Sequence, residues 1–528
     1  MNDENNKSKQ FKHRLHRIHV STGIVFSLLM YIAVFFGIFA ILLPYIQVWE
    51  KPSRHFETAD ITKINYSAMI DPVISDPNFP QNNIIIKLPG YMNDPALHVT
   101  HQFTEASVFN PTTMEKIKHE GLNSQLARFL NGMHYGRPIK DVGYTIFGFM
   151  AVGVMFLIIG GLILINTLKF KNNGKNQQST FSKWHRKIFT WVFPPFIIIT
   201  LTGALMCIGF TGAGPMTYLT TKGEKNDVIA LIGPILSPTE KIVKRLNNPK
   251  PMMPISELIK KAQEINPQIE FQKLLLVNWK DSTARVELSG YNPYKPFLNG
   301  IYNKPKIILS AVDGKVIKDV RVMDRPWSIL VADALYFLHL LFGVDIFTRI
   351  FIAFIMLSSC FAIGFGVMLW LEKKAKKFGN KIHFYHWMGK FSQAIMIGVI
   401  PATALLFNIQ WLLPFDYENR VFVQQSIFFN FWLATLAWSF YRINSYKAAK
   451  EYLALGGILF VTAPIIHFII SGFSPLELVQ GGMSSILGID IMLFILGILL
   501  TISAYKLPKE RAEAKFFWNK KQKRFTND

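Results

Sequence analysis

The chain has little cysteine, and both of its cysteines lie in apolar surroundings. Cys207 and Cys360 fall inside long hydrophobic runs of the sequence and not in polar loops. Two such residues cannot build a disulfide framework, a C-x-x-C redox pair or a cysteine-ligated iron–sulfur cluster. Any redox chemistry in this protein therefore has to use other ligands.

The chain is also poor in charge, and this excludes an ordinary soluble domain. Charged residues make up 17% of the 528 residues, whereas 50% are hydrophobic and 45 are Phe. This composition is typical of a membrane protein. The 57 Lys and Arg outnumber the 34 Asp and Glu, but they concentrate in short segments between apolar runs. Those segments lack interleaved aromatic residues, so we do not expect nucleic acid as a partner.

Eight apolar runs are long enough, at roughly 20 residues, to cross a lipid bilayer as helices. They lie near residues 20–44, 142–168, 188–210, 344–371, 390–413, 425–441, 452–472 and 484–504. The first run is too long for a signal-peptide core and lacks a small-residue cleavage site, so we expect it to stay as a signal anchor. The sequence therefore predicts an all-α membrane protein of about eight transmembrane helices.

The basic connections and both termini fall on one side of these runs, which the positive-inside rule assigns to the cytoplasm. We expect a multi-pass protein of the bacterial cytoplasmic (inner) membrane with both termini inside. The predicted divisions are a cytoplasmic N-terminus (1–19), a first span (20–44), a first outer segment (45–141), a second span (142–168), a cytoplasmic loop (169–187), a third span (188–210), a second outer segment (211–343), a fourth span (344–371), a cytoplasmic loop (372–389), a C-terminal bundle of four spans (390–504) and a cytoplasmic tail (505–528).

The two outer segments have the pattern of small α+β modules with antiparallel strands. In the second, ISELIKKAQEINPQ predicts a short amphipathic helix, and the stretches after it alternate like strands around an Asp313-Gly314 turn. The first has NIIIKLPGY and LHVTHQFTEASVFN, with Pro111-Thr112-Thr113 as a comparable turn.

The sequence also contains an internal duplication, marked by four histidines. His19 precedes Gly37 by eighteen residues in one span, and His185 precedes Gly203 by eighteen in another. Each unit then has an outer segment that ends in a short helix with a histidine, His134 in FLNGMHYGR and His339 in LYFLHLLFG. The predicted unit is a helix, an outer module and a return helix, present twice.

These four histidines pair by depth, and their chemistry suits haem. His19 and His185 lie at cytoplasmic helix ends, whereas His134 and His339 lie at outer ends. Imidazoles are common axial ligands of haem iron, and a helix bundle can present them to one macrocycle. The simplest assignment is two haem b groups, each with two histidine ligands. Arginines at these levels can neutralise haem propionates, namely Arg17, Arg186, Arg137 and Arg349.

Other histidines are assigned less directly. His383 and His386 lie on the cytoplasmic side of the fifth predicted span, just before it begins, where either can replace an inner ligand or serve near a quinone. His467 lies near the outer end of the seventh span, and we expect a hydrogen-bonded core histidine, with a proton-handling residue and an alternative ligand as the other options. His98 and His101 are three apart in a predicted strand, which puts them on opposite faces and predicts solvent-facing residues.

No glycine-rich dinucleotide motif and no Walker motif occurs in the sequence. Electrons would therefore enter from a membrane quinol or from a separate reductase protein. On the outer face, Tyr135, Arg137, Arg325 and Trp327 are candidate lining residues for a substrate near the outer histidines, since Arg suits an anionic chelate. An ordinary interfacial belt explains the same four residues equally well.

The chain resembles the PepSY-associated transmembrane family over roughly residues 11 to 395. The resemblance rests on LHRIHVSTG, on KWHRKIF with IITLTGAL, and on SAVDGKVIKDVR. The family includes iron-regulated membrane proteins of the PiuB type and inner-membrane ferric-siderophore reductases. The resemblance implies a PepSY-like periplasmic module in each repeat and haem held by helix-end histidines. The matching positions here are His19, His134, His185 and His339, with His386 as a further one at the start of the fifth span.

The first repeat departs from the family pattern, because Phe36-Gly37 stands where Thr-Gly is usual and Pro-Thr-Thr replaces the Asp-Gly turn. The function that the resemblance implies is a haem b electron-transfer protein that reduces a ferric siderophore or another ferric chelate in the periplasm. One alternative is a PepSY-bearing regulator or assembly factor without redox activity. Another is a transporter with a polar pathway in the membrane.

Overall fold

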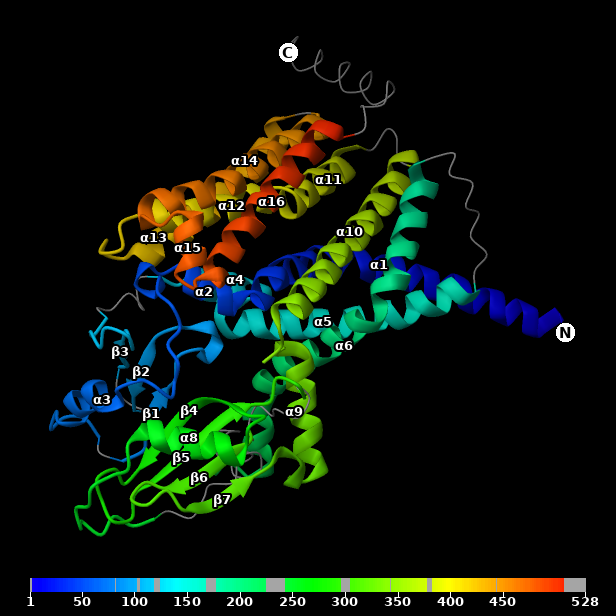
Figure 1. Cartoon of the computed structure of the whole chain (residues 1–528). Coiled ribbons are helices and arrows are strands. Elements are labelled where there is room, and N and C mark those ends of the chain that lie inside the picture. The colour runs from blue at the N-terminus through cyan, green and yellow to red at the C-terminus, as the bar shows by residue number, and fades with distance from the viewer. Residues whose placement is uncertain are drawn as a thin grey trace.

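The computed structural model describes residues 2–80, 82–101, 105–117, 124–167, 177–224, 243–295, 304–341, 343–377, 382–442 and 444–507. Figure 1 shows a large helical part with a single β-sheet at one end of it. The helices of the C-terminal third lie together beside the helices of the two repeats. The molecule thus has three regions, namely the repeat helices, the outer sheet and the C-terminal bundle.

Seven candidate membrane spans are present in the described residues, by length and composition. They lie in α1 (Asn2–Ile41), α5 (Lys140–Thr167), α6 (Gln177–Thr220), α10 (Ile346–Lys377), the consecutive helices α11 (Ile382–Met396) and α12 (Val399–Leu412), α14 (Ser445–Ser471) and α16 (Ser484–Lys506). The prediction of a multi-pass helical membrane protein is therefore confirmed.

The eighth predicted span, residues 425–441, is not confirmed. It falls in α13 (Arg420–Tyr441), a helix of 22 residues, which at 1.5 Å per residue is long enough to cross a bilayer. It is less apolar than the others, because Gln424, Gln425 and Asn430 interrupt its hydrophobic residues. α13 packs against α11 and α12 within the C-terminal bundle.

Shorter helices connect the spans to the outer region. These are α2 (Leu43–Trp49), α3 (Tyr66–Ile74), α4 (Leu126–His134), α8 (Ile255–Ile265), α9 (Trp327–Leu340), α15 (Pro475–Gln480) and the 3-10 turns η1 (Pro52–Arg54), η2 (Tyr91–Asn93), η3 (Arg137–Ile139) and η5 (Val322–Asp324). α4 and α9 are the helices in which the outer histidines were predicted, and both end at or next to their histidine.

The strands of both outer segments form one antiparallel sheet of seven strands, in the order β3-β2-β1-β4-β5-β6-β7. The strands are β1 (Ile84–Lys87), β2 (Leu97–Thr100), β3 (Ser107–Phe109), β4 (Glu270–Val277), β5 (Arg285–Tyr291), β6 (Lys306–Ser310) and β7 (Val316–Val320). β1 of the first segment pairs with β4 of the second. The two predicted modules are therefore not separate bodies, because each covers the exposed edge of the other.

One face of this sheet carries a hydrophobic core under α3 and α8. Ile84 and Ile86 of β1 and Leu274 and Leu276 of β4 are fully buried there, as the alternation of strand side chains requires. The predicted amphipathic helix is α8, whose Leu258 is also fully buried. The predicted Asp-Gly turn joins β6 to β7, with Gly314 at a φ of 70°.

The four repeat helices α1, α5, α6 and α10 pack against one another. α1 has a second neighbour in the C-terminal bundle, since a continuous hydrophobic core joins its Phe36 and Phe39 to Phe407 of α12 and Phe428 of α13. The C-terminal bundle is thus packed onto the first repeat and is not a separate domain.

Candidate functional site

The predicted inner pair of histidines lines one cavity between the four repeat helices. His19 of α1 and His185 of α6 both face it, with α5 and α10 completing its wall. The space not filled by atoms, including the open mouth, is about 1420 Å³. Cofactor pockets are typically apolar cavities with a few polar groups, and most side chains that line this cavity are apolar.

The charged and imidazole groups of this cavity gather near the helix ends that the sequence predicts to be cytoplasmic. They are His16, Arg186 and Lys373, together with the two predicted ligands, and Ser182 lies with them, whereas the small hydroxyls of Ser27 and Ser359 lie farther along α1 and α10. Arg186 donates a hydrogen bond to Ser182 Oγ at 2.5 Å. A group with an apolar body and anionic ends therefore fits this cavity, with the anionic ends beside Arg186 and Lys373.

The predicted outer pair of histidines is also brought together by the fold. The ring centroids of His134 in α4 and His339 in α9 are 6.0 Å apart, at an interplanar angle of 36°. Their separation in sequence is more than two hundred residues. The pairing by depth that the sequence predicted is thus the pairing that the tertiary structure makes.

All four histidines sit on neighbouring helices in the same way, with a glycine under the ring. A Cβ added to Gly203 would lie 3.0 Å from Cε1 of His339, closer than real Cβ contacts tolerate without a shift. The corresponding distances to Cε1 are 3.2 Å for Gly37 below His134, 3.2 Å for Gly161 below His19 and 3.1 Å for Gly366 below His185.

Each ring also meets the backbone carbonyl four residues before its glycine. His134 Nδ1 lies 2.6 Å from the Ala33 carbonyl oxygen, His185 Nδ1 lies 2.7 Å from that of Ala362, and His339 Nδ1 lies 3.2 Å from that of Ile199. His19 interacts with the carbonyl of Leu157 in the same position, without full hydrogen-bond geometry. The missing Cβ opens the helix surface so that an imidazole can reach this carbonyl.

This arrangement decides which ring nitrogen is free. A carbonyl oxygen can only accept, so in His134, His185 and His339 Nδ1 must be the protonated donor and Nε2 keeps its lone pair. None of the four Nε2 atoms has a hydrogen-bond partner among the described residues. A backbone carbonyl on the second nitrogen is the usual way in which a metal-ligating histidine is oriented.

The glycines repeat with the histidines, and two of them were missed in the sequence. The spacing from His134 to Gly161 is 27 residues, and the spacing from His339 to Gly366 is also 27. Gly37 and Gly203 were seen only as markers of the repeat. The equal spacing of Gly161 and Gly366 was the signal that could have identified them as ring supports.

The ring spacing of the predicted outer pair is compatible with one metal ion between two imidazoles. With metal–nitrogen bonds of about 2.0–2.1 Å, opposed nitrogens lie about 4 Å apart and the ring centroids behind them about 6 Å apart. The 6.0 Å observed between His134 and His339 agrees with this. The described residues contain no group of three or more His, Cys, Asp or Glu side chains arranged to hold a metal. Two histidines suit an ion whose other ligands come from a macrocycle.

Polar contacts fix the helices that carry the outer histidines. The buried Glu50 carboxylate accepts a hydrogen bond from the Ala127 backbone at the start of α4, at 2.8 Å, and the Glu50 carbonyl accepts one from Ser124. The Arg349 guanidinium donates to the carbonyls of Ile41, Leu341 and Val344. Arg349 therefore holds helix ends together, a role different from the propionate contact predicted for it.

The candidate substrate-lining residues fall into two groups. Tyr135 and Arg137 follow His134 directly, and Arg137 contacts the Tyr135 hydroxyl at 3.5 Å. Trp327 is 77% exposed at the opposite end of α9 from His339, about 18 Å away along the helix axis. Arg325 precedes α9 at that same end. Only the first group is adjacent to the outer pair.

The remaining histidine predictions have mixed outcomes. His467 is fully buried and hydrogen-bonded, as expected. His98 is not solvent-facing, since its ring contacts the Asp94 carboxylate at 3.0 Å and its side chain is 18% exposed. The side chains of His383 and His386 lie outside the described part of the structure, so a ligand role for His386 stays a prediction.

A buried polar chain in the C-terminal bundle was missed because its members are far apart in the sequence. His467 Nδ1 lies 2.9 Å from Asp490, and its Nε2 lies 2.9 Å from Nε2 of His55. His55 Nδ1 contacts the carbonyl of Lys51 at 2.9 Å, and the Trp49 indole donates to Asp490 at 2.7 Å. Both nitrogens of each imidazole are engaged, so this cluster offers no ligand to a metal.

Comparison with known proteins identifies one family. The family model of the PepSY-associated TM region matches residues 16–373, about two thirds of the chain. The match covers both repeats, all four histidines and the sheet, and it ends before the C-terminal bundle. A comparison with curated proteins gave no match.

Proposed function

We propose that this chain, which belongs to the PepSY-associated transmembrane family, is a haem b electron-transfer protein that reduces a ferric chelate, such as a ferric siderophore, on the outer side of the bacterial inner membrane. His19 and His185 would hold one haem, and His134 and His339 would hold the other. Haem supplies a one-electron carrier at each level. The chain supplies the ligands, their orientation and the apolar surroundings.

The observation that carries this proposal is the fourfold repetition of one ligand geometry. Each of His19, His134, His185 and His339 stands over a glycine, with Nδ1 toward a carbonyl and Nε2 without a partner. A structural histidine in a membrane core would satisfy both nitrogens, as His467 does. Four histidines with the same free nitrogen, in two facing pairs, support ligation instead.

The inner cavity supports the same proposal by its charge distribution. Its apolar wall would exclude water from a macrocycle, while Arg186 and Lys373 at its cytoplasmic end can hold two anionic side groups. Gly37, which supports His134, is eighteen residues after His19 on the same helix, which corresponds to about 27 Å. The two sites therefore lie at opposite membrane levels, as electron transfer across a bilayer requires.

The direction of electron transfer follows from which histidine pair a ferric chelate can reach. A ferric chelate outside the cell membrane can meet only the outer pair, and electrons would come from a membrane quinol or a separate reductase, since no dinucleotide-binding motif occurs in the sequence. Reduction weakens the hold of hard oxygen chelators on iron, because such ligands favour the more highly charged ion.

Difference spectra of the purified protein test the haem assignment. We expect b-type bands from two components, with His19→Ala or His185→Ala removing one and His134→Ala or His339→Ala removing the other. His101→Ala, in the outer region, is the control and should leave both. A protein without b-type bands would instead favour the regulator or the transporter alternative. Loss of both components in every variant would argue against two independent sites.

The direction of reduction is tested in sealed, oriented vesicles with prereduced protein. A membrane-impermeant ferric chelate added to the outer face should oxidise the haem, and the same chelate on the cytoplasmic face should not. Oxidation from the cytoplasmic face alone, or from neither face, would refute the proposed direction.

A further inference from the structure

The face of the outer sheet that α3 and α8 leave uncovered carries lysines in direct opposition. Lys87 of β1 and Lys273 of β4 are cross-strand partners in the register of the sheet. Ile86 and Leu274, their neighbours along the strands, are fully buried on the helix-covered face, so the lysines project from the other one. Like charges directly opposite each other destabilise a sheet.

A third lysine joins this pair through an aromatic ring. The Nζ atoms of Lys87 and Lys304 lie 5.5 and 5.6 Å from the centroid of the Tyr91 ring. A cation–π contact attracts each ammonium group to the ring face, and it leaves both positive charges in place. Two cations therefore share the Tyr91 ring, and Lys273 lies opposite one of them in the sheet.

The positive charge continues toward the outer histidine pair. Burial, and then the charge of Arg128 in α4, lowers the pKa of Lys87. Burial also lowers the pKa of Lys51; Glu50 opposes this, whereas Arg54 and, less strongly, Arg128 act in the same direction. Burial, and then the charge of Lys87, lowers the pKa of Lys273 in the same way. Arg128 precedes His134 by six residues in α4, about 9 Å along the axis.

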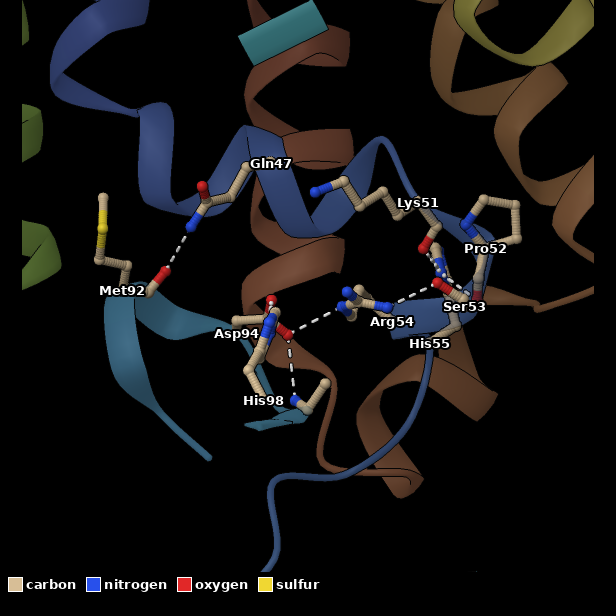
Figure 2. Close-up of polar contacts among 10 residues, drawn as sticks. Gln47, Lys51, Pro52, Ser53, Arg54, His55, Met92, Asp94 and His98 are labelled. Carbon is tan, nitrogen blue, oxygen red and sulfur yellow. Dashed lines mark hydrogen bonds and ion pairs between the residues drawn. The ribbon is translucent and has the colours of Figure 1, made fainter. Parts of the chain in front are cut away.

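The acidic groups of this region are already engaged. Figure 2 shows Asp94 between Arg54 and His98, with contacts of 2.9 and 3.0 Å. Glu287 pairs with Lys306 at 3.1 Å. Within the described residues, Lys87, Lys273 and Lys304 form no ion pair within 4.0 Å.

We propose that these five side chains, which we call the cationic row, bind a ferric chelate of net negative charge through its peripheral carboxylates. The row consists of Lys51, Lys87, Arg128, Lys273 and Lys304. The inference rests on the proposed function, because it names the substrate class of the same outer face. The four lysines are half-buried, and Lys87, Lys273 and Lys304 have no ion-pair partner among the described residues. Such mutual repulsion is costly in the free protein, and an anionic ligand removes that cost.

The length of the row distinguishes this ligand from a single small anion. The cations come from α4, the segment after α2, the neighbouring strands β1 and β4, and the residues just before β6, so one monovalent anion cannot contact them all. Lysine ammonium groups act as point charges that suit carboxylate or phosphate oxygens. Phosphates of anionic lipids share this chemistry, and the experiment has to separate them from a soluble chelate.

Binding of Ga(III) citrate, which is anionic and cannot be reduced like its iron counterpart, tests the row without electron transfer. Calorimetry uses the full-length protein in nanodiscs of zwitterionic lipid. We expect Lys87→Gln and Lys273→Gln each to weaken binding about fivefold, which corresponds to about 1 kcal/mol. Lys260→Gln on α8, across the sheet, is the charge-matched control and should bind like the wild type.

An uncharged Ga(III) trihydroxamate should bind much more weakly than Ga(III) citrate. Equal affinity for the two chelates, or variants that bind like the wild type, would overturn the proposal. In a third outcome, the wild type fails to bind Ga(III) citrate in zwitterionic nanodiscs and yet retains more anionic lipid than Lys273→Gln. That pair of results would assign the row to lipid phosphates and would also overturn the proposal. Because gallium binding needs no haem redox step, loss of the haem assignment alone would leave this result intact.

Thermal unfolding without ligand gives an independent readout. Lys87→Gln and Lys273→Gln should raise the melting temperature, because each removes a cross-strand repulsion, whereas Lys260→Gln should not change it. A fall in both variants would show that the lysines serve the fold and would contradict a ligand site.

Discussion

At the scale of single residues, the central feature is the glycine beneath each of four imidazoles. Glycine in a helix interior costs roughly 0.5–1 kcal/mol relative to alanine. Here it lets a ring approach the helix until Nδ1 can reach a carbonyl, as in the 2.6 Å contact between His134 and Ala33. The helix thus loses some stability, and the neighbouring imidazole gains a fixed position against a carbonyl.

Gly203→Ala tests this arrangement. The new methyl group would lie 3.0 Å from Cε1 of His339, so the ring must move and its contact with the Ile199 carbonyl weakens. Changes of this kind in groups that orient a ligand typically lower metal affinity 10–100-fold. We therefore expect selective loss of the outer haem on dilution, followed by its absorption bands.

Gly209→Ala provides the matched control for that substitution. Gly209 lies in the same helix, and a Cβ there would meet nothing within 4 Å. This variant should keep both haem components and gain slightly in helix stability. If Gly203→Ala and Gly209→Ala behaved alike, the ring contact would have no bearing on cofactor retention.

A second residue-scale prediction concerns pH and Asp94. Burial opposes ionisation of Asp94, but the hydrogen bond with His98 and the charge of Arg54 outweigh it, so the pKa of Asp94 falls well below its ordinary value. A carboxylate with a depressed pKa stabilises the folded state at pH values above its unfolded-state pKa of about 3.9. This stabilisation is lost as the pH falls below that value.

Asp94→Asn should therefore destabilise the junction of the sheet with the segment after α2 by about 3 kcal/mol at pH 7, because buried Arg54 loses its partner. The difference from the wild type should narrow as the pH falls below about 4. Chemical denaturation at several pH values measures this difference in the free energy of unfolding. Glu264→Gln, at an exposed position, is the control. A difference that is constant from pH 7 to pH 3 would contradict the ion-pair explanation.

At the scale of elements, the C-terminal bundle is attached to the first repeat by the chain from His55 through His467 to Asp490. These residues come from the segment after α2, from α14 and from α16. His467 and Asp490 are nearly completely buried, at 0% and 1% exposure. Breaking such a network by removing one member leaves an unpaired polar group in an apolar core.

His467→Ala should accordingly lower the stability of the protein by about 3–5 kcal/mol while both haem components persist, because His467 is not one of the four proposed ligands. Thermal unfolding and difference spectra of the same sample measure the two effects. Exposed Glu477→Gln in α15 is the control. Loss of one spectral component with unchanged stability would instead make His467 a ligand.

At the scale of the whole molecule, the side of the membrane on which the C-terminus lies depends on α13. The loops that flank α13 are short, with α12 ending at Leu412 and α14 beginning at Ser445. Helices joined by short loops are antiparallel neighbours, and α13 is long enough to cross. We expect eight crossings, with both termini in the cytoplasm.

Fusions with alkaline phosphatase, which is active only outside the cytoplasm, test this topology. Fusions after Pro251 and after Glu418 should be active, whereas fusions after Lys175 and after Asn444 should not. The fusions after Pro251 and Lys175 report the orientation of the helices before α11. The fusions after Glu418 and Asn444 report whether α13 crosses the membrane. Activity after Asn444 would mean that α13 does not cross, and it would move the C-terminus outside.

The sequence by itself determined the features that depend on local pattern and on repetition. Apolar runs defined the spans, because a bilayer demands a fixed length of hydrophobic helix. The eighteen-residue spacing from His19 to Gly37 and from His185 to Gly203 predicted a duplication, and depth along the helices predicted which histidines lie near each other in the structure. The α8 helix and the Gly314 turn also followed from local pattern.

Only the tertiary structure decided what depends on contacts between distant segments. The pairing of β1 with β4 merges two predicted modules into one sheet, and a strand pattern does not name the partner of a strand edge. The same holds for the opposition of Lys87 to Lys273 and for the contact of His55 with His467. Side-chain periodicity assigns a residue to a face, but the residue that it meets there is fixed by packing of the whole chain.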